Sequence, residues 1–577
     1  MKAEWKLLST DANLELMSEV LGVSEITAKV LANRGIRSKN SAISFLHPSE
    51  KKLHDIGIMS DTKKALKRIK DGIEDGKIIV YGDYDADGIT STVILCKVLR
   101  RLGANCEYYM PHRINDGYGL NPNAIEKINE MGAKLVIAVD NGISALEEVA
   151  LANSFGIDVI VVDHHEPAFE VCEGRRTDIL PPAFAILDPK QNTCGYPFKE
   201  ICGAVLAYKL AEALCKYCGL DFVEKDELLV LAAIATLCDI VPLVDENRII
   251  VKLGLRALNT NKLINPGLGS LIALRGYMDK PLDTFTVSYV LGPCLNATGR
   301  LESAAIAVDL LLSDQAQKSQ KLAEELVRLN NERKNLTQEC INRLMQEIPE
   351  KLPKVLVLTD LDAHESVAGI VAGRIREATG RPTILLTKGD GVLKGSGRSI
   401  EKYNFFEALL SNNHLFVRFG GHAMACGITM ACENVDTLRN ALNESCPLEE
   451  EDFRVEILLD GELSLGQINL KLSDELEYLA PYGKGNEEPL FASMRLYTES
   501  VKVLDEKRTL IFSFSKDGHR LKGIAFGKNE LYDSITKEAG VNKSGGYFLD
   551  VVYTIETNEW NGVKSVQLRI RDFRVSS

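Results

Sequence analysis

Short apolar runs alternate with longer amphipathic stretches in the first third of the chain. Ile78-Ile79-Val80-Tyr81 has the continuous apolar pattern of a buried strand, and residues 89–102 have the spacing of an amphipathic helix that ends before Gly103. The same order repeats, with strands at 135–139 and 159–162 and a helix at 144–155 between them. Repeated strand–helix–strand units with apolar strands predict a parallel α/β sheet, whose ligands collect at the carboxyl ends of the strands.

Helical spacing dominates the middle of the chain, from residue 203 to residue 312. Residues 315–348 then form one uninterrupted helical pattern without glycine or proline before Pro349, which predicts a helix that connects two domains. A second α/β unit begins at residues 354–358 and extends to residue 446.

Short alternating strands are expected after Phe453. Residues 554–556 and 566–570 lie on either side of Asn561-Gly562, a dipeptide that strongly indicates a tight β-hairpin. We therefore expect a small β-barrel at the C-terminal end of the sequence, and oligonucleotide-binding (OB) barrels are one frequent kind.

The composition is that of an ordinary globular protein. The 577 residues are 45% hydrophobic and 26% charged, and this length predicts about three to four domains. No window has the roughly 18 uninterrupted apolar residues of a membrane span, so no membrane partner is expected. The first residues lack the apolar core of an export signal. Thirteen cysteines, an odd number scattered over predicted helices and strands, favour the reducing cytoplasm.

The net charge of −13 argues against a broadly basic protein that coats duplex DNA. It is compatible with a nuclease that holds one strand in a narrow channel, because bound metal ions and a few arginines reverse the field locally.

Acidic residues directly follow two of the predicted strands. Asp85 and Asp87 lie two residues apart in a glycine-flanked segment after the first strand, and Asp140 follows the strand at 135–139. Carboxylate oxygens are the ligands that hard divalent cations prefer. The alternative for each segment taken alone is a solvated acidic turn.

A third strand is followed by Asp163-His164-His165. Because neighbouring residues of a strand point to opposite faces, His164 can ligate a metal ion while His165 faces a substrate. Three such segments at successive strand ends predict two metal ions side by side, which would make a phosphoester-cleaving centre.

Asp163-His164-His165 resembles the signature of the DHH phosphoesterase superfamily, and residues 82–88 resemble the first motif of its RecJ-type exonucleases. The likeness continues, in the order expected of that family, at 237–243, 292–300, 364–374, 395–399, 420–427, 481–486 and 559–562. The resemblance implies a parallel-sheet DHH domain joined by a long helix to a smaller α/β DHH-associated (DHHA1) domain, followed by an OB-like β-barrel. The implied segments are a helical segment at 1–50, the DHH catalytic domain at 51–313, the connecting helix at 314–348, the DHHA1 domain at 349–448 and a nucleic-acid-binding OB-fold at 449–577.

The resemblance also implies two Mn²⁺ or Mg²⁺ ions. Their ligands would be Asp85, Asp87, Asp140, His164 and Asp239, with Asp140 bridging the two ions. Asp83 and Asp163 would support these ligands, and His165 would contact the scissile phosphate. Tyr81 stands where the wider superfamily often has a histidine, so one ion would have fewer protein ligands.

Further residues are assigned to the substrate by the resemblance. Arg300 would neutralise negative charge that grows during the reaction; a salt bridge at a helix N-terminus is its alternative role. Arg113, Ser396 and Arg398 would hold the 5′-terminal phosphate, because a guanidinium fork suits phosphate oxygens. The remaining implied substrate-binding residues are Asn296, Gly421 and His422, and for the last two a glycine turn with a packed histidine is the alternative.

The leading hypothesis is a metal-dependent enzyme that degrades single-stranded DNA from the 5′ end to mononucleotides, in DNA repair and recombination. Its partner would be a single strand with a 5′ end; single-strand-binding protein and a helicase are implied by the resemblance alone. One alternative is a DHH phosphodiesterase of short oligonucleotides or cyclic dinucleotides, against which the residues beyond Phe453 argue. The other is a non-catalytic replication scaffold, which the presence of every implied metal-binding residue disfavours.

Overall fold

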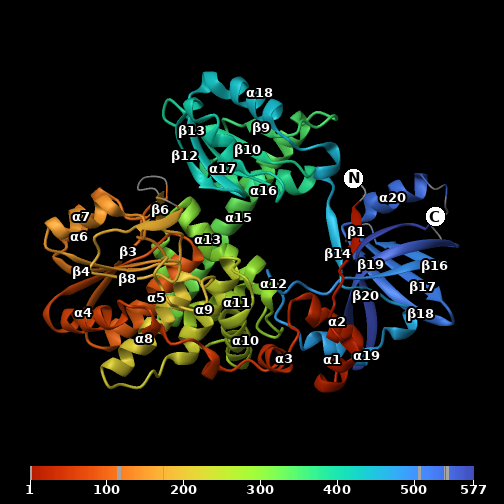
Figure 1. Ribbon diagram of the computed structural model, residues 1–577, viewed down its shortest axis with the longest axis horizontal. Helices are drawn as coiled ribbons and strands as arrows, with labels where there is room; N and C mark the ends of the chain where they lie inside the picture. The colour runs from red at the N-terminus through yellow and green to blue at the C-terminus, as the bar shows by residue number, and fades with distance from the viewer. Residues whose placement is uncertain are drawn as a thin grey trace. The chain divides into compact units, whose positions relative to one another are not determined.

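The chain is described by a computed structural model over residues 3–113, 119–172, 174–504, 508–538, 540 and 545–576. Two compact units are formed (Figure 1). The first comprises His54–Val241 and Leu253–Val455, and the second comprises Ala3–Leu53, Pro242–Lys252 and Glu456–Ser577. Among the described helices, none combines the length and the apolar character needed to cross a membrane.

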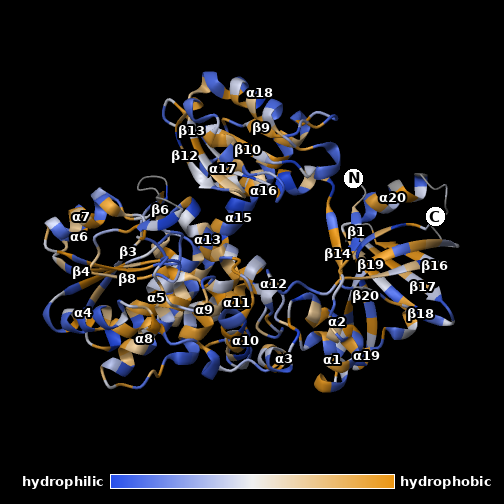
Figure 2. Cartoon of the chain, in the orientation of Figure 1, coloured by the Kyte–Doolittle hydropathy of each residue, from blue (hydrophilic) through white to orange (hydrophobic). Residues whose placement is uncertain are grey.

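The first unit contains the predicted parallel sheet, with the strand order β3-β2-β4-β5-β8. Its strands are β2 (Lys77–Tyr81), β3 (Asn105–Tyr109), β4 (Ala133–Val139), β5 (Asp158–Val162) and β8 (Ala185–Leu187). Hydrophobic residues run along these strands (Figure 2), as expected for a sheet that is covered on both faces.

Helices cover both faces of this sheet (Figure 1). The helices α6 (Pro122–Glu130) and α7 (Leu146–Ser154) share one apolar core with the sheet. On the other face lie α4 (Thr62–Asp75), α5 (Ala86–Arg101) and α8 (Gly203–Tyr217). The chain passes from β2 to β3 on one side and then places β4 on the other side of β2, so the strand order reverses between β2 and β4. In open α/β sheets ligands bind at such a reversal, outside the carboxyl ends of the strands.

Helices follow the sheet, as the sequence predicts. They are α9 (Lys225–Cys238), α10 (Asp245–Thr260), α11 (Pro266–Leu274), α12 (Thr284–Thr286), a π-helical turn (Val287–Leu291), α13 (Gly292–Leu301), α14 (Ala305–Leu312) and α15 (Ala316–Glu347). The long helix expected at 315–348 is therefore present as α15. It packs against α11, α13 and α14 and also against α16 (Ala368–Thr379), so one helix contacts both α/β parts of the first unit.

A second, smaller sheet completes the first unit, in the order β12-β13-β11-β10-β9. Its strands are β9 (Leu356–Thr359), β10 (Thr383–Lys388), β11 (Leu393–Arg398), β12 (Phe416–His422) and β13 (Ala425–Met430), with the helices α17 (Phe405–Leu410) and α18 (Val435–Ser445) nearby. In the described part of this sheet, β9 and β10 are the one parallel pair, and the other neighbouring strands are antiparallel. A β-hairpin of β6 (Ala168–Cys172) and β7 (Arg175–Ile179) follows the first sheet's Asp163-His164-His165 segment.

The second unit is built on the expected barrel. Its strands are β15 (Gly461–Glu462), β16 (Phe491–Leu504), β17 (Thr509–Lys516), β18 (His519–Phe526), β19 (Tyr547–Trp560) and β20 (Val563–Val575), with the helices α19 (Leu470–Glu477) and α20 (Asn529–Glu538). Pairing of β16 with β19 closes the sheet on itself. The predicted hairpin is confirmed, because Asn561 (φ 50°) and Gly562 (φ 76°) both have the left-handed conformation of a tight hairpin turn.

The N-terminal residues pack onto this barrel. They form β1 (Glu4–Leu7), α1 (Leu14–Leu21), α2 (Glu25–Asn33) and α3 (Lys39–Leu46). Ala28, Val30 and Leu31 share one core with the barrel residues, and β1 pairs in parallel with β14 (Glu456–Leu459). The sequence predicts the helices of this segment, but it does not predict that they pack on the barrel, which is more than 400 residues away along the chain. The hydrogen bond from Ser24 Oγ to Glu475 illustrates this, because it joins residues separated by 451 positions.

Candidate metal centre and phosphate site

The segment after β2 turns sharply into α5. Asp85 is the N-cap of α5, and its Oδ1 accepts hydrogen bonds from the N–H groups of Asp87 (2.9 Å) and Gly88 (3.1 Å). A side chain at position 88 would come within 2.5 Å of the Asp83 backbone, so this turn requires glycine. The tight turn thus holds Asp83, Asp85 and Asp87 at one end of β2.

Asp87 faces the start of a second helix. Its two carboxylate oxygens accept hydrogen bonds from the N–H groups of Gly203 and Ala204, each 2.7 Å long, at the N-terminus of α8. A Cβ atom at Gly203 would lie 2.9 Å from the Cβ atom of Asp140, so a glycine here lets α8 approach the strand end closely. Sequence reasoning did not identify Gly203, and only its place at the start of a helix could have drawn attention to it.

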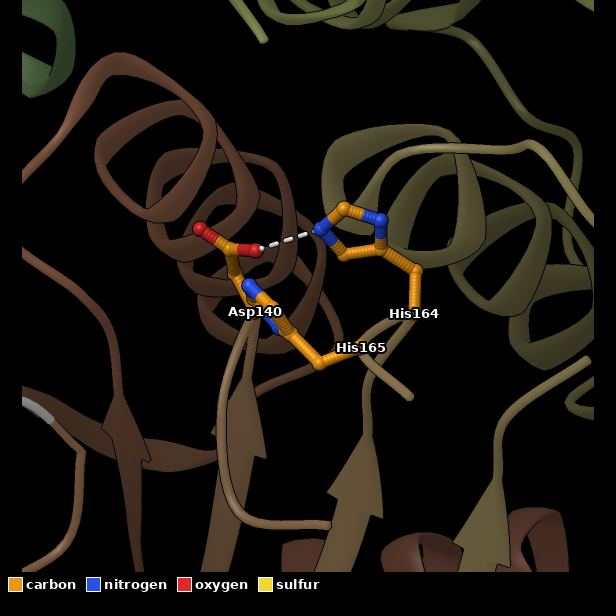
Figure 3. A group of neighbouring side chains, drawn as sticks. All are labelled: Asp140, His164 and His165. Carbon is orange, nitrogen blue, oxygen red and sulfur yellow. Dashed lines mark hydrogen bonds and ion pairs between the residues drawn. The ribbon is translucent and has the colours of Figure 1, made fainter. Parts of the chain in front are cut away.

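Asp140 lies at the end of β4 in the left-handed conformation, with φ 60°. This conformation is uncommon for a residue other than glycine and is often found at functional sites. Figure 3 shows the His164 ring directed at the Asp140 carboxylate. The His164 Nε2 atom lies 3.0 Å from Asp140 Oδ1, 3.6 Å from Asp87 Oδ2 and 3.9 Å from Asp239 Oδ2. Four residues predicted as metal ligands therefore converge on one point.

Asp163 holds the two histidines in place. Its Oδ1 accepts hydrogen bonds from the His164 N–H (2.8 Å) and from the His165 N–H (3.3 Å), and it lies 2.7 Å from His165 Nδ1. Burial opposes ionisation of Asp163, but the hydrogen bond from His165 and the charges of both histidines outweigh it and lower the pKa to about 2. An ionised Asp163 makes Nδ1 of His165 the donor and directs Nε2 away from it.

Burial is also the largest cause of the raised pKa values of the other aspartates in the site. Burial, followed by the charge of Asp85, raises the pKa of Asp87 to about 6. Burial and the charges of Asp87 and Asp85 raise the pKa of Asp239 to about 8. For Asp140 the same causes raise the pKa well above its usual range. Burial and the charge of His165 lower the pKa of His164 to about 3, so that this ring is neutral and able to ligate a metal ion.

The donor set fits hard divalent cations. Ligand atoms lie within 4.8 Å of one another in three groups: Asp83, Asp85 and Asp140; Asp87, His164 and Asp239; and Asp140, His164 and His165. We call the residues Asp83, Asp85, Asp87, Asp140, His164 and Asp239 the metal-site cluster. Asp140 belongs to two of the groups, and crowded carboxylates with raised pKa values are what a bound cation would relieve.

Asp83, which the resemblance assigns a supporting role, lies in one group with Asp85 and Asp140. Its Oδ1 is buried and accepts no hydrogen bond from any described residue, which leaves it available to a cation. The Tyr81 hydroxyl instead donates to the Gly119 carbonyl (2.9 Å) and accepts from Asn121 (3.3 Å). Tyr81 is thus engaged in contacts with two residues just before the helix α6.

Two arginines, Arg113 and Arg300, lie beside the metal-site cluster, and Arg398 lies near Arg300. The guanidinium of Arg113 lies 4.9 Å from the ring centroid of Tyr84. Arg300 is in the last turn of α13 and donates to the Ser366 carbonyl (2.9 Å), so the alternative of a salt bridge at a helix N-terminus does not describe it. Burial, followed by the charges of Arg113 and Arg333, lowers the pKa of Arg300 to about 10. In the described part of the chain no carboxylate forms an ion pair with Arg113, Arg300 or Arg398.

Ser396 and Arg398 lie on β11 of the second sheet, with their side chains on the same face. Arg398 Nη1 donates to Ser396 Oγ (3.0 Å) and to the Gly397 carbonyl (2.8 Å). Burial lowers the pKa of Arg398, and the charges of Arg113 and Arg376 also lower it. The charge of Arg113 acts on Arg398, so Arg113 lies in the neighbourhood of Arg398 and Ser396. We call Arg113, Ser396 and Arg398 the phosphate site.

The other predicted substrate residues fall into two places. Ala425 on β13 pairs with Arg398 on β11 on one side and with His422 on β12 on the other. The side chains of Arg398 and His422 therefore lie on one face of the sheet, and the distance between their strands is about 10 Å. Gly421 has φ 137° and pairs with Cys426, one residue out of that row. The Asn296 Oδ1 atom accepts from the Ala86 N–H (2.7 Å), so this side chain also holds the start of α5.

Residues that sequence reasoning missed lie next to these sites. Tyr84 contacts Arg113 through its ring. Asp188 follows β8 and is fully buried, and burial with the charge of Asp163 raises its pKa to about 8. The charge of Lys190 lowers the pKa of both His164 and Asp239, which places its ammonium group near the metal-site cluster. The strand-end position of Asp188 was a usable signal; for Tyr84 and Lys190 the sequence offers none.

Comparison with known proteins agrees with this architecture. The "DHH family, N-terminal domain" model matches residues 77–237, the "DHHA1 domain" model matches 352–446, and the "RecJ OB domain" model matches 459–572. The single-stranded-DNA-specific exonuclease RecJ of Bacillus subtilis is 37% identical over 587 residues, which cover 100% of this chain and 71% of that protein.

Two solved structures are similar over the whole chain. Thermus thermophilus RecJ in complex with Mn²⁺ superposes with a TM-score of 0.82 at 29% identity, covering 100% of this chain and 80% of that chain. The complex of the same protein with Mg²⁺ gives a TM-score of 0.76 at 28% identity, covering 100% and 79%. The sequence-based expectation of a DHH, DHHA1 and OB-like architecture is confirmed.

Proposed function

Because the chain belongs to the RecJ family of exonucleases, we propose that it degrades single-stranded DNA from the 5′ end and releases mononucleotides. The reaction is hydrolysis of phosphodiester bonds with Mn²⁺ or Mg²⁺ as the cofactor. The observation that supports this most is that the phosphate site lies close to the metal-site cluster. Within the described chain, the arginines of the phosphate site have no carboxylate partner.

We propose that two ions are held by Asp85, Asp87, Asp140, His164 and Asp239, with Asp140 bridging them and Asp83 as a further ligand. Such ions, when bound, lower the pKa of water and stabilise negative charge on the phosphate. The residues of the chain supply the geometry: Asp85 and Asp87 are fixed by backbone N–H groups, and Asp140 is fixed by its strand end. Fixed ligands need little rearrangement when charge develops.

His165 is proposed to contact the scissile phosphate. Asp163 accepts from Nδ1 of His165, so the Nε2 atom on the opposite side of the ring points away from Asp163. Burial alone would lower the pKa of His165, but the hydrogen bond to Asp163 and its charge raise the value to about 9. A ring that carries a proton at neutral pH donates a charge-assisted hydrogen bond to a phosphate oxygen.

Arg113, Ser396 and Arg398 are proposed to bind the terminal 5′-phosphate, and Arg300 is proposed to neutralise negative charge near the scissile bond. Asn296, Gly421 and His422 are proposed to contact the strand. Arg300 has Arg113, Asp85 and Arg398 among its charged neighbours, so it lies between the metal-site cluster and the phosphate site. A single 5′-terminal nucleotide would then place its terminal phosphate in one site and its 3′ linkage in the other.

The polarity and the product are tested in one time course with the same single strand labelled at the 5′ or at the 3′ end. With Mn²⁺ or Mg²⁺, the 5′ label should appear first as a mononucleotide, and the 3′ label should shorten progressively. The Asp140→Asn variant controls for a contaminating nuclease. Intact strands after incubation with metal, or a 3′ label released first, would contradict the proposal.

The alternatives from the sequence are not favoured by the structure. A phosphodiesterase of dinucleotides has no use for a barrel, whereas residues 459–572 match the RecJ OB domain model. A non-catalytic scaffold has no need of metal ligands, whereas the metal-site cluster is complete. Turnover of a dinucleotide compared with that of a long strand separates the first alternative, and metal analysis of the purified protein tests the second.

We propose DNA repair and recombination in the cytoplasm as the setting. The described cysteines are free thiols, which agrees with a reducing compartment. Single-strand-binding protein and a helicase are proposed as partners that would present the single strand. The five sequence segments given above remain predictions for the limits of the domains.

A further inference from the structure

The helix α16 packs on the face of the second sheet that carries Ser396 and Arg398. Gly369 lies in the first turn of this helix. A Cβ atom built at Gly369 would lie 2.7 Å from Arg398 Nη2 and 3.0 Å from Ser396 Oγ, which are the polar ends of both side chains. Any residue other than glycine would therefore occupy the space that these two groups use.

We infer that Gly369 is a positioning residue that determines the specificity for a 5′-terminal phosphate by leaving room for the Ser396–Arg398 pair. This inference rests on the proposed function, because it takes these two residues as ligands of the terminal phosphate. Gly369 lies beside Arg398 and Ser396 and acts through them.

The Arg398 nitrogen that lies nearest Gly369 is able to donate further hydrogen bonds. Arg398 Nη1 is occupied by Ser396 Oγ and the Gly397 carbonyl. Within the described residues neither Nη2 nor Nε donates a hydrogen bond, so both can donate to a phosphate oxygen, and Nη2 is the one beside Gly369. A methyl group at Gly369 would push this nitrogen out of its position while the bond to Gly397 holds the other one.

The charge at this place suits a terminal phosphate rather than an internal linkage. Arg113 and Arg376 both act on Arg398 as like charges, and no carboxylate of the described chain pairs with Arg398. A phosphomonoester carries up to two negative charges near neutral pH, whereas an internal phosphodiester carries one. Charge-assisted bonds to a dianion are correspondingly stronger, so removal of these contacts should affect the 5′-phosphorylated strand most.

Gly373, one helical turn further along α16, offers a matched control. A Cβ atom at Gly373 would lie 3.8 Å from Arg398 Cγ, an ordinary van der Waals contact with the aliphatic part of the side chain. Both glycines lie in α16 without a left-handed φ, so alanine suits the backbone at either position and raises helix propensity. The two variants differ in what the added methyl group meets.

The experiment compares the full-length wild type, Gly369→Ala and Gly373→Ala on two strands of one sequence, with a 5′-phosphate or with a 5′-hydroxyl. We would measure kcat and KM for each strand in the presence of Mn²⁺. We would also measure the melting temperature and the Mn²⁺ affinity of each protein. We expect Gly369→Ala to reduce the preference for the phosphorylated strand about tenfold or more, mainly through KM, by loss of a charge-assisted hydrogen bond. Its melting temperature should equal or exceed that of the wild type, and its Mn²⁺ affinity should be unchanged. Gly373→Ala should keep the wild-type preference.

Each contrary result has a distinct meaning. A wild-type preference retained by Gly369→Ala overturns the inference and leaves the exonuclease proposal intact. A lowered melting temperature of Gly369→Ala, or an equal loss of preference in Gly373→Ala, also overturns it, because the glycine would then serve the fold. A wild type that degrades both strands equally well removes the phosphate site and the inference with it. A wild type that degrades neither strand removes the proposed function.

Discussion

The guanidinium of Arg113 lies over the ring of Tyr84, 4.9 Å from its centroid, and Tyr84 is the residue between Asp83 and Asp85. One short segment therefore supplies carboxylates to the metal-site cluster and an aromatic face to the phosphate site. The metal-site cluster and the phosphate site are thereby linked through adjacent residues of one segment.

Loss of this aromatic face should weaken binding of the 5′-phosphorylated strand. For Tyr84→Leu we expect KM to rise several-fold, since a cation–π contact contributes about 0.5 to 2 kcal/mol. The Tyr84→Phe variant keeps the ring and should behave like the wild type in steady-state kinetics. Equal KM values for all three proteins would show that the ring does not hold Arg113.

Asp140→Asn should separate activity from stability. Asparagine tolerates the left-handed conformation of this position, and loss of the charge relieves repulsion from Asp87 and Asp85. We expect activity to fall by roughly 10³-fold or more, while the metal-free variant melts at a higher temperature than the metal-free wild type. Thermal melts with EDTA and with Mn²⁺ test this, because the stabilisation by Mn²⁺ should shrink in the variant.

Asp71→Asn, on the exposed side of α4, serves as the control for Asp140→Asn. It removes one negative charge far from the described metal-site contacts and should leave both activity and the Mn²⁺ effect unchanged. A metal-free Asp140→Asn protein that melts below the wild type would contradict the repulsion argument.

Metal binding should release protons near neutral pH. In the metal-free protein burial and neighbouring carboxylates raise the pKa of Asp239 to about 8, so this group is mostly protonated at pH 7. A cation competes with that proton and with the proton favoured on Asp140, whose pKa is raised well above its usual range, so we expect release of at least one proton per protein at pH 7. Affinity for Mn²⁺ should therefore rise as pH increases through the pKa values of Asp87 (about 6) and Asp239 (about 8). Calorimetric titrations in two buffers of different ionisation enthalpy measure the proton count; a count of zero would refute the assigned protonation.

Glu475 should make the second unit sensitive to acid. Its Oε2 accepts from Ser24 Oγ (2.6 Å), the Ser24 N–H (2.8 Å) and Thr27 Oγ1 (2.8 Å) at the start of α2. Burial opposes its ionisation, but these hydrogen bonds outweigh burial and lower the pKa of Glu475 below the ordinary 4.5. The unfolded chain then takes up the proton more readily, so the stabilisation is complete above the ordinary pKa and is lost as pH falls through the lowered one.

Glu475→Gln tests this assignment. The variant should lose about 1 to 2 kcal/mol of stability at pH 7 and much less at pH 3, as measured by denaturant unfolding. A difference from the wild type that is the same at both pH values would show that the charge of Glu475 has no part in it.

The sequence predicts those parts of the fold that depend on local pattern. The strands at 78–81, 135–139 and 159–162 were visible because a sheet covered on both faces needs continuous apolar runs. Asp140 and His164 were found because strand ends of a parallel sheet meet. In contrast, Asp239 ends the helix α9 and reaches the cluster through tertiary packing, so only the family resemblance identified it.

Contacts between distant segments were beyond local pattern. The four residues of β1, Glu4–Leu7, carry no clear strand signal and become a strand by pairing with β14. The sequence gives no reason to connect Gly369 with the phosphate site, because that role depends on the position of Arg398 in the folded chain. Likewise, only the structure shows that the Asp83 Oδ1 atom is buried near Asp85 and Asp140 without a hydrogen bond from a described residue.

The starts of α5 and α8 both point at the aspartates, one through Asp85 and the other through Asp87. The N-terminus of a helix carries a partial positive charge, so these two ends already offset some of the repulsion among the acids. The carboxylates are thereby assembled before any cation arrives. Unlike a zinc finger, this protein should remain folded after chelation and recover its activity at once when the ion is returned.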